Sequence, residues 1–184
     1  VLGTAKSSGP IPTPEKAYDP KSLEHILAGT YPKEEDMIKE MDAVCKVFKK
    51  YDVKVFRPEV IENVNQIFAR DIALVIDDKI IDCNILPDRQ NEIEAIRYVI
   101  DQIDRRKIIT LPHDAHIEGG DVIPHNDYIF VGTYSQPDYK DFITARTNSL
   151  AVKLLSEHFP HKTVKSFELR KSNTDPRNNA LHLD

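Results

Sequence analysis

Two stretches of this chain follow the same order of predicted elements, and this repetition constrains the fold more than any other feature of the sequence. Each stretch has two short apolar segments around a polar turn, then an amphipathic helix, then a further apolar strand. The turns fall at residues 77–78 and 126–127, and Asp71 and Asp121 open the two hairpins. Such a periodicity indicates an α/β fold assembled from repeated ββαβ units.

The helix of the first unit follows from isoleucines that recur at helical spacing, and the second unit repeats the pattern with different residues. We expect strands at residues 72–76, 79–84 and 107–111 with a helix at 91–104, and strands at 121–123, 128–131 and 163–169 with a helix at 148–158.

The part of the chain before the first unit has a different character. Residues 4–32 are rich in Pro, Ser, Lys and Gly, and predict a long surface excursion with at most a short helix near 21–27. An apolar stripe then predicts a helix at 33–51, which a short strand at 53–55 follows. The stripe consists of Ile38, Met41, Cys45 and Phe48.

The phase of the repeat places both ends of the chain inside a unit. Because one unit cannot bury its apolar face without neighbours, we expect the parent protein to be longer in both directions. The chain is then a single partial domain, 1–184, in which 1–56 ends one unit, 68–111 and 117–169 are two further units, and 180–184 begins the next.

Composition excludes several classes of protein. The net charge is -5 and the charges of both signs are interspersed, so the chain lacks the basic stripe that nucleic-acid binding requires. No apolar run is long enough for a membrane helix. Cys45 and Cys83 do not form a CxxC or zinc spacing, which favours a reducing, cytoplasmic compartment.

The candidate functional residues lie at the entries to the hairpins, at residues 68–71, 116–121 and 181–184. These segments hold equivalent positions in successive units, so an arrangement around a pseudo-symmetry axis would bring their carboxylates and a histidine together. Gly119 and Gly120 would let the backbone approach a ligand closely. The pattern predicts a central polar site.

Each of these motifs alone also fits a simpler explanation. Arg70 and Asp71 could form a local ion pair, the tripeptide at 119–121 could be a plain turn, and His182 could be a hydrogen-bonded core histidine. The occurrence of all three at equivalent positions favours a functional site.

Four motifs resemble, in order and spacing, those of the guanidino-group-modifying superfamily, which includes arginine deiminases, dimethylarginine hydrolases and amidinotransferases. The resemblance implies the pentein fold, a β/α propeller of five ββαβ units, of which about three would be present here. It also implies a small guanidino substrate, and leaves a homo-oligomer open. The motifs are Phe-Ala-Arg-Asp at 68–71, Ile-Glu-Gly-Gly-Asp-Val at 117–122, Ala-Arg-Thr-Asn at 145–148 and Leu-His-Leu-Asp at 181–184.

The same resemblance implies how the substrate is held. Asp71 and Asp184 match the carboxylates that grip the substrate guanidinium, a planar cation whose five N–H donors need matching acceptors. Arg146 and, less closely, Arg89 match arginines that hold the substrate carboxylate.

The resemblance further implies the catalytic pair. His182 matches the general acid and base, and Glu118 matches the acid that accompanies it, with Asp121, Gly119 and Gly120 in supporting positions. The reaction that the resemblance implies is attack by a cysteine thiolate on the guanidinium carbon, through a covalent amidino-cysteine intermediate and without a metal or other cofactor.

The nucleophile of this superfamily lies near the C-terminus of the complete protein, so we expect it after Asp184 and expect the 184-residue chain alone to be inactive. Neither cysteine of the chain fits the role. Cys45 lies on the apolar stripe of a helix and Cys83 on the return strand of a hairpin, and both are predicted to be buried structural thiols.

Three classes of function stay open: a guanidino-modifying enzyme, a non-catalytic binding protein and a metal-dependent hydrolase. The stretch at 68–84 favours an amidinotransferase, with a deiminase or dimethylarginine hydrolase as the alternative. A non-catalytic binding protein can use the same fold. A metal-dependent hydrolase is a further alternative, although its candidate ligands lack a fixed spacing. Those ligands are His113, His116, Glu118, Asp121 and His125.

Overall fold

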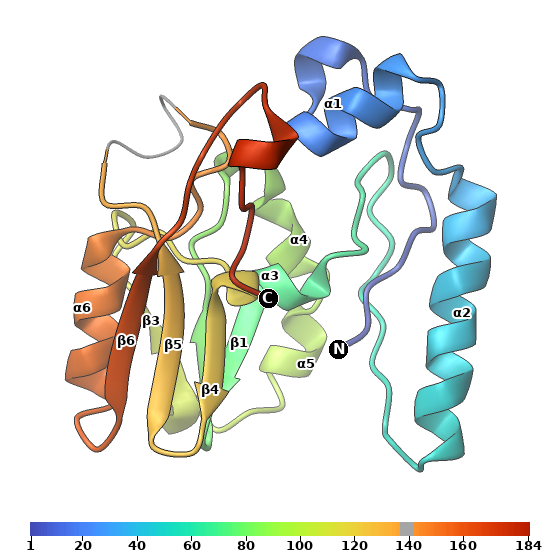
Figure 1. The fold of residues 1–184 in the computed structure, drawn as a ribbon. Helices are drawn as coiled ribbons and strands as arrows, with labels where there is room; N and C mark the ends of the chain where they lie inside the picture. Colours follow the sequence, from blue (N-terminus) through green and yellow to red (C-terminus); the bar gives the residue numbers. More distant parts are fainter. Residues whose placement is uncertain (137–141) are drawn as a thin grey trace.

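A computed structural model describes residues 1–136 and 142–184 of the chain. It is a mixed α/β protein in which two three-stranded sheets lie beside each other, and helices lie on both sides of them (Figure 1). No helix within the described ranges is both long and apolar enough to cross a membrane.

The first sheet contains β1 (Ala73–Ile76), β2 (Lys79–Asp82) and β3 (Ile108–Thr110). Strands β1 and β2 are antiparallel, with Val75 opposite Ile80, and β3 pairs with β2 in parallel. The hairpin turn places Asp77 at a φ of 54°, a conformation that Asp tolerates better than most residues. The predicted hairpin and third strand are confirmed.

The helix predicted at 91–104 is wrong as a single element, because the chain forms α4 (Asn91–Glu94) and α5 (Arg97–Ile100) instead. Ile96 separates them, with φ -113° and ψ 7°, outside the helical region. Around this break the amides of Ile96 and Val99 donate to carbonyls three residues back, the tighter bonding of a 3₁₀ turn. The isoleucine pattern identified the buried face but not the interruption.

The 3₁₀ helices η2 (Pro87–Arg89) and η3 (Arg105–Lys107) flank these two short helices. The return strand predicted to reach residue 84 ends earlier, at Asp82. Asn84 instead uses its side-chain amide to donate to the carbonyls of Pro112 and Ala115, which holds the loop before the second unit.

The second sheet repeats the first. It contains β4 (Val122–His125), β5 (Tyr128–Thr133) and β6 (Thr163–Glu168), with β4 and β5 antiparallel and β6 parallel to β5. Helix α6 (Ser149–His158) precedes β6, and the side chain of Asn148 caps it by accepting from the amide of Ala151 at 3.1 Å. Both described units therefore have the predicted ββαβ order.

The N-terminal region is less regular. It contains η1 (Pro14–Lys16), α1 (Pro20–Leu27) and α2 (Glu34–Lys50), so both predicted helices are confirmed. Thr4 at the start of the predicted surface excursion is buried, since it pairs with Gln66 in an isolated β-bridge. The strand predicted at 53–55 is wrong, because those residues have no ladder partner among the described residues.

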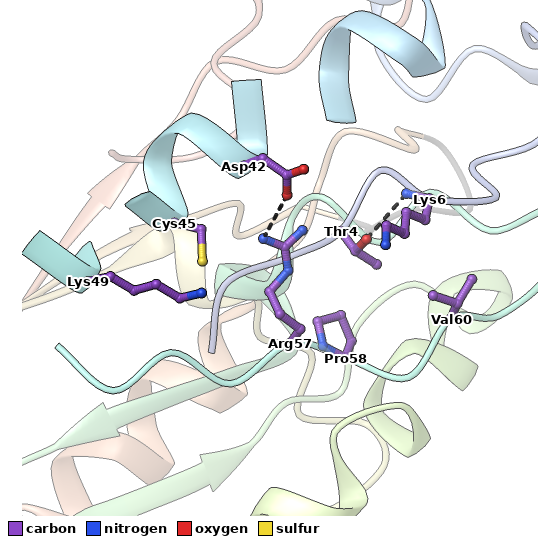
Figure 2. Close-up of a pocket in the computed structure, with 8 residues that line it drawn as sticks. All are labelled: Thr4, Lys6, Asp42, Cys45, Lys49, Arg57, Pro58 and Val60. Carbon is purple, nitrogen blue, oxygen red and sulfur yellow. Dashed lines mark hydrogen bonds and ion pairs between the residues drawn. The ribbon is translucent and has the colours of Figure 1, made fainter. Parts of the chain in front are cut away.

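Helix α2 lies apart from the sheets, and none of its residues is buried (Figure 1). Its apolar stripe is only partly covered, so the prediction of a buried Cys45 is wrong. The thiol of Cys45 instead lines a surface pocket beside Lys49 and Arg57 (Figure 2). Periodicity defined the face of the helix correctly, but it carries no information on what packs against that face.

The C-terminal segment 180–184 was expected to begin a strand, and it is not in a strand. It follows η5 (Pro176–Asn178) and runs from there to the C-terminus, which lies near the start of β4 (Figure 1). Two backbone hydrogen bonds fix it: the amide of Ala180 donates to the carbonyl of Arg170, and the amide of Asp184 donates to the carbonyl of Gly120.

Both units contribute to one apolar core, which explains why the sheets stay together. Ile81 and Cys83 come from the first unit, and Ile129, Val131 and Leu155 from the second, and all are buried in the same cluster. Burial of this continuous apolar surface is the main stabilising term of the fold.

The core predicts a contrast between two leucine truncations. Leu155→Ala should lower the free energy of unfolding by about 2 to 5 kcal/mol, because Leu155 on α6 is 0% exposed and its loss leaves a cavity. Leu27→Ala on α1, where the leucine is 70% exposed, should change it by less than about 0.5 kcal/mol. Chemical denaturation of both variants measures the difference, and equal effects would contradict the assignment of this core.

Candidate active site

Three polar side chains from separate parts of the chain meet beside the residues that lead into the first hairpin. Asp71 comes from α3 (Ala69–Ile72), Glu118 from the residue before η4 (Gly119–Asp121), and His182 from the C-terminal segment. One ligand atom from each lies within 4.8 Å of the others. The structure thus brings together two carboxylates and an imidazole, as the hairpin positions predicted.

Glycines make this meeting possible. A Cβ atom on Gly119 would lie 1.9 Å from the carbonyl oxygen of Arg70, so only glycine allows η4 to pack against α3. A Cβ on Gly120 would lie 2.7 Å from the imidazole of His182. These glycines were predicted to let the backbone approach a ligand. In the structure they let it approach other parts of the protein, Arg70 and His182.

Among Asp71, Glu118 and His182, the shortest contact joins His182 and Glu118. His182 Nε2 lies 2.8 Å from Glu118 Oε2, and Glu118 is fully buried. Burial of His182 opposes protonation, but the hydrogen bond to Glu118 and the charges of Asp71 and Asp121 outweigh it and raise the pKa of the imidazole. The carboxylate of Glu118 therefore favours the protonated form of the ring.

Glu118 is ionised in spite of its burial. Burial alone would raise its pKa, but the hydrogen bond from His182 and the charges of Arg146 and Arg89 lower the pKa to about 2. Arg146 Nη1 lies 3.0 Å from Glu118 Oε2 and 3.2 Å from Oε1, and Arg89 Nη1 lies 3.5 Å from Oε2. The carboxylate is surrounded by three cations.

Arg89 also connects Glu118 to Asp71. Its Nη1 donates to Asp71 Oδ2 at 3.1 Å, while Nε and Nη2 donate to the two oxygens of Glu92 at 2.8 and 3.1 Å. Asp71 Oδ1 faces away from this pair, 3.9 Å from His182 Nδ1. A planar guanidinium is thus already bound by the carboxylates on this side of the site.

Arg146 is similarly committed to the protein. It is 3% exposed, and in addition to Glu118 its Nε donates to the carbonyl of Ile143 at 2.8 Å. The predicted role of Arg89 and Arg146 in holding a substrate carboxylate stays a prediction, because in this structure both guanidinium groups bind carboxylates of the chain.

Asp184 lies beside the cluster and not within it. Its Oδ2 accepts from Arg70 Nε at 2.7 Å, and both side chains are about half exposed. Arg70 also donates to the carbonyl of Val122 at 3.0 Å. The alternative of a local ion pair between Arg70 and Asp71 is therefore wrong, since each of the two pairs with a residue distant in sequence.

Asp121 is buried next to the cluster in a different environment from Glu118. Neither of its carboxylate oxygens has a hydrogen-bond partner of good geometry among the described residues. Burial raises the pKa of Asp121 to about 6, against the weaker influence of the nearby His182, Thr147 and Lys171. Gly132 gives it room, because a Cβ there would lie 2.7 Å from Asp121 Oδ1.

The structure adds site residues that the sequence did not indicate. Glu92 is buried and binds Arg89, and the only sequence signal for this pair was its i, i+3 spacing at the start of the helix predicted at 91–104. Lys171 and Arg70 anchor the segment that carries His182 and Asp184. Contacts of this kind depend on tertiary structure, for which a single sequence gives no pattern.

The metal and thiol alternatives have less support. Of the five ligands proposed for a metal, only Glu118 belongs to the group of described residues whose ligand atoms converge, and two arginines contact it there. Cys83 is buried, as predicted, and burial raises the pKa of its thiol well above the usual range, which disfavours a nucleophilic thiolate.

The raised pKa of Asp121 predicts how stability depends on pH. The unfolded carboxyl ionises near 3.8 and the folded one near 6, so stability falls as pH rises through this window, by an amount on the order of 3 kcal/mol. Asp121→Asn should therefore gain stability relative to wild type between pH 4 and pH 7. Urea denaturation at both pH values measures this.

The matched control is Asp77→Asn in the first hairpin turn. Hydrogen bonds from Lys162 and His161 lower the pKa of Asp77 below its ordinary value of 3.8, so this carboxyl is ionised in both the folded and the unfolded state across the same window. The stability of this variant relative to wild type should therefore stay nearly constant between pH 4 and pH 7. The same pH trend in both variants would refute the assignment.

The close contact between Gly120 and His182 predicts that a methyl group added at position 120 will disturb the site. Gly120→Ala should push the imidazole of His182 away from Glu118, since the new Cβ would overlap the ring. We expect the pKa of His182 to fall toward its ordinary value and the free energy of unfolding to drop by about 1 to 3 kcal/mol. NMR titration of the histidine ring measures the shift, and an unchanged titration curve would refute the contact.

No protein-family profile matches the chain, and no curated protein matches it either. Solved structures do. The N-terminal domain of ArgZ, a cyanobacterial arginine dihydrolase, superposes with a TM-score of 0.68 at 13% identity, over 91% of this chain and 56% of that one. A DDAH from Pseudomonas aeruginosa complexed with citrulline gives 0.64 at 17% identity, over 78% of this chain and 54% of that one.

A third similar structure is SxtG, an amidinotransferase from the saxitoxin biosynthetic pathway of Microseira wollei. It gives a TM-score of 0.63 at 19% identity, over 91% of this chain and 58% of that one. This chain thus spans somewhat more than half the length of each of the three structures. At these identities the likeness shows the fold, and the chain has the pentein fold of these enzymes of guanidino-group chemistry.

Proposed function

We propose that the full-length protein modifies the guanidino group of arginine or a related compound through a covalent amidino-cysteine intermediate. The observation that supports this most directly is the convergence of Asp71, Glu118 and His182 in one buried cluster. Enzymes of guanidino chemistry that share the fold add support, without identifying the substrate.

The charges of the cluster suit a guanidinium substrate. A guanidinium stays protonated in proteins, so its site must supply carboxylate acceptors. Asp71 Oδ1 is turned away from Arg89 and offers one such acceptor. Asp184 offers a second after the substrate displaces Arg70, an exchange that costs little because this ion pair is half exposed.

His182 has the properties that the acid step requires. Its raised pKa favours the protonated imidazole, and the ring nitrogen Nε2 lies 2.8 Å from the carboxylate of Glu118. In the proposed reaction a cysteine thiolate from outside residues 1–184 attacks the guanidinium carbon, and His182 protonates the departing amine. The neutral imidazole then deprotonates the acceptor that releases the amidino group.

The acceptor distinguishes two outcomes on the same site. We favour transfer to an amine, an amidinotransferase reaction, on the resemblance of residues 68–84, and hydrolysis by water is the second candidate because ArgZ and DDAH share the fold. Transfer from arginine releases ornithine, whereas attack by water with loss of ammonia yields citrulline.

Product analysis tests this proposal. Full-length protein incubated with arginine should form ornithine in the presence of an amine such as glycine, or citrulline without one. Agmatine and methylated arginines should be tried under the same conditions. Binding of these compounds without any product would favour the non-catalytic alternative, and activity that chelators abolish but thiol alkylation leaves intact would favour a metal enzyme.

Two variants separate the proposed roles. His182→Gln should reduce kcat by about 10²- to 10⁴-fold, the usual effect of losing a general acid and base. Asp71→Asn should mainly raise KM, by about 10- to 100-fold, because it removes a charged acceptor for the guanidinium. The control is His161→Gln, which removes an exposed imidazole that also contacts a carboxylate, Asp77. Equal losses in all three variants would argue against the assigned roles.

A further inference from the structure

A lysine side chain anchors the backbone of the segment that carries His182. Lys171 Nζ donates to the carbonyl of Ala180 at 2.8 Å and to the carbonyl of Leu181 at 2.9 Å. Both carbonyls immediately precede the histidine. On the other side of His182, the amide of Asp184 donates to the carbonyl of Gly120 at 3.2 Å. The histidine therefore lies between two fixed points.

Little regular secondary structure fixes the backbone that Lys171 contacts. Residues 179–184 belong to no strand or helix, and the backbone bond from Ala180 to Arg170 is the nearest support before His182. An ammonium that donates to two successive carbonyls restrains two peptide planes at once, and charge-assisted bonds are about twice as strong as neutral ones. Lys171 thus restrains the direction in which the chain enters His182.

The position of the ammonium is costly for the protein. Burial lowers the pKa of Lys171 to about 8, even though the charge of Asp121 opposes the effect. A lysine is rarely placed where burial disfavours its charge unless its contacts compensate. Besides Asp121, the charged groups that influence it are Arg146, Glu118 and Glu168, and all of them except Glu168 belong to the site or its supporting shell.

We propose that Lys171 is a positioning residue, which holds the backbone before His182 so that the imidazole meets Glu118. The proposal rests on the proposed function in that His182 is its acid and base. Lys171 does not touch the reacting atoms in this scheme. Its effect reaches the reaction through the hydrogen bond between His182 Nε2 and Glu118 Oε2.

The direction of one pKa change tests the proposal. In full-length Lys171→Met the imidazole should move away from Glu118, so the pKa of His182 should fall toward its ordinary value. Loss of a nearby positive charge alone would instead raise that pKa. NMR titration of the His182 ring distinguishes the two, and a rise or no change would overturn the positioning role.

Kinetics give a second readout. Lys171→Met should lower kcat by about 100-fold with KM changed less than about threefold, the signature of a misplaced catalytic group. Lys171→Arg, which keeps the charge and two or more donors, should recover most of the loss. An equal loss in the Arg and Met variants would contradict the proposal.

The matched control is Lys162→Met. Lys162 Nζ also donates to a backbone carbonyl, that of Asn126 at 2.8 Å, and its side chain is only 10% exposed, but it lies at the hairpin turn of the second unit. It should lose stability without moving the pKa of His182. Should Lys171→Met not fold, Lys171→Gln is titrated in its place, since glutamine is too short to reach both carbonyls.

The outcomes separate this proposal from the function on which it rests. If full-length protein modifies no guanidino compound, the proposed function fails, and the titration of His182 still decides whether Lys171 positions the ring. If activity is present and His182 titrates identically in the wild type and the Lys171→Met variant, only the positioning role fails.

Discussion

The carboxylate of Glu118 is fully buried and ionised, and the arrangement of the site depends on how that charge is compensated. An isolated buried carboxylate is far too costly to keep, so the fold must bring cations to it. Arg89, Arg146 and His182 are those cations, and they come from three different segments of the chain. The charge of Glu118 therefore links the first unit, the loop before α6 and the C-terminal segment.

Asp121 shows what happens to a carboxylate at nearly the same burial without such partners. It lies three residues from Glu118, and the two pKa values move in opposite directions, to about 6 for Asp121 and about 2 for Glu118. The difference comes from neighbours, because desolvation raises both. Adjacent turns of one motif thus hold one carboxylate that is permanently charged and one that titrates near neutral pH.

The sequence predicted the parts of this structure that depend on local patterns. Both hairpins, the third strand of each unit and α6 follow from alternation, turn residues and helical spacing. The break at Ile96 and the half-covered face of α2 were missed, because neither depends on periodicity. Periodicity identifies which face is apolar, and only tertiary packing decides whether that face is covered.

For the site, the sequence predicted which residues would come together but not which charged groups would pair. The equivalence of hairpin entries predicted that Asp71, Glu118 and His182 would converge, and they do. The partner of each charge could not be predicted, since Arg70 binds Asp184 over a separation of 114 residues and Arg89 binds Asp71, Glu92 and Glu118 together. One sequence without relatives contains no signal for such contacts.

The ion pairs within the chain also bear on the proposed chemistry. Arg89 demonstrates that this wall of the site can hold a planar guanidinium, with its Nη1 near two carboxylates and its other nitrogens on Glu92. Asp71 keeps one oxygen directed toward His182, so a second guanidinium could be bound next to the first with its carbon near the imidazole. A likeness of fold supplies only the scaffold for this argument. The argument for guanidino chemistry comes from the carboxylates, because a site that neutralises one guanidinium and still presents an acceptor beside a histidine of raised pKa is suited to binding a second guanidinium and to protonating the amine that leaves it.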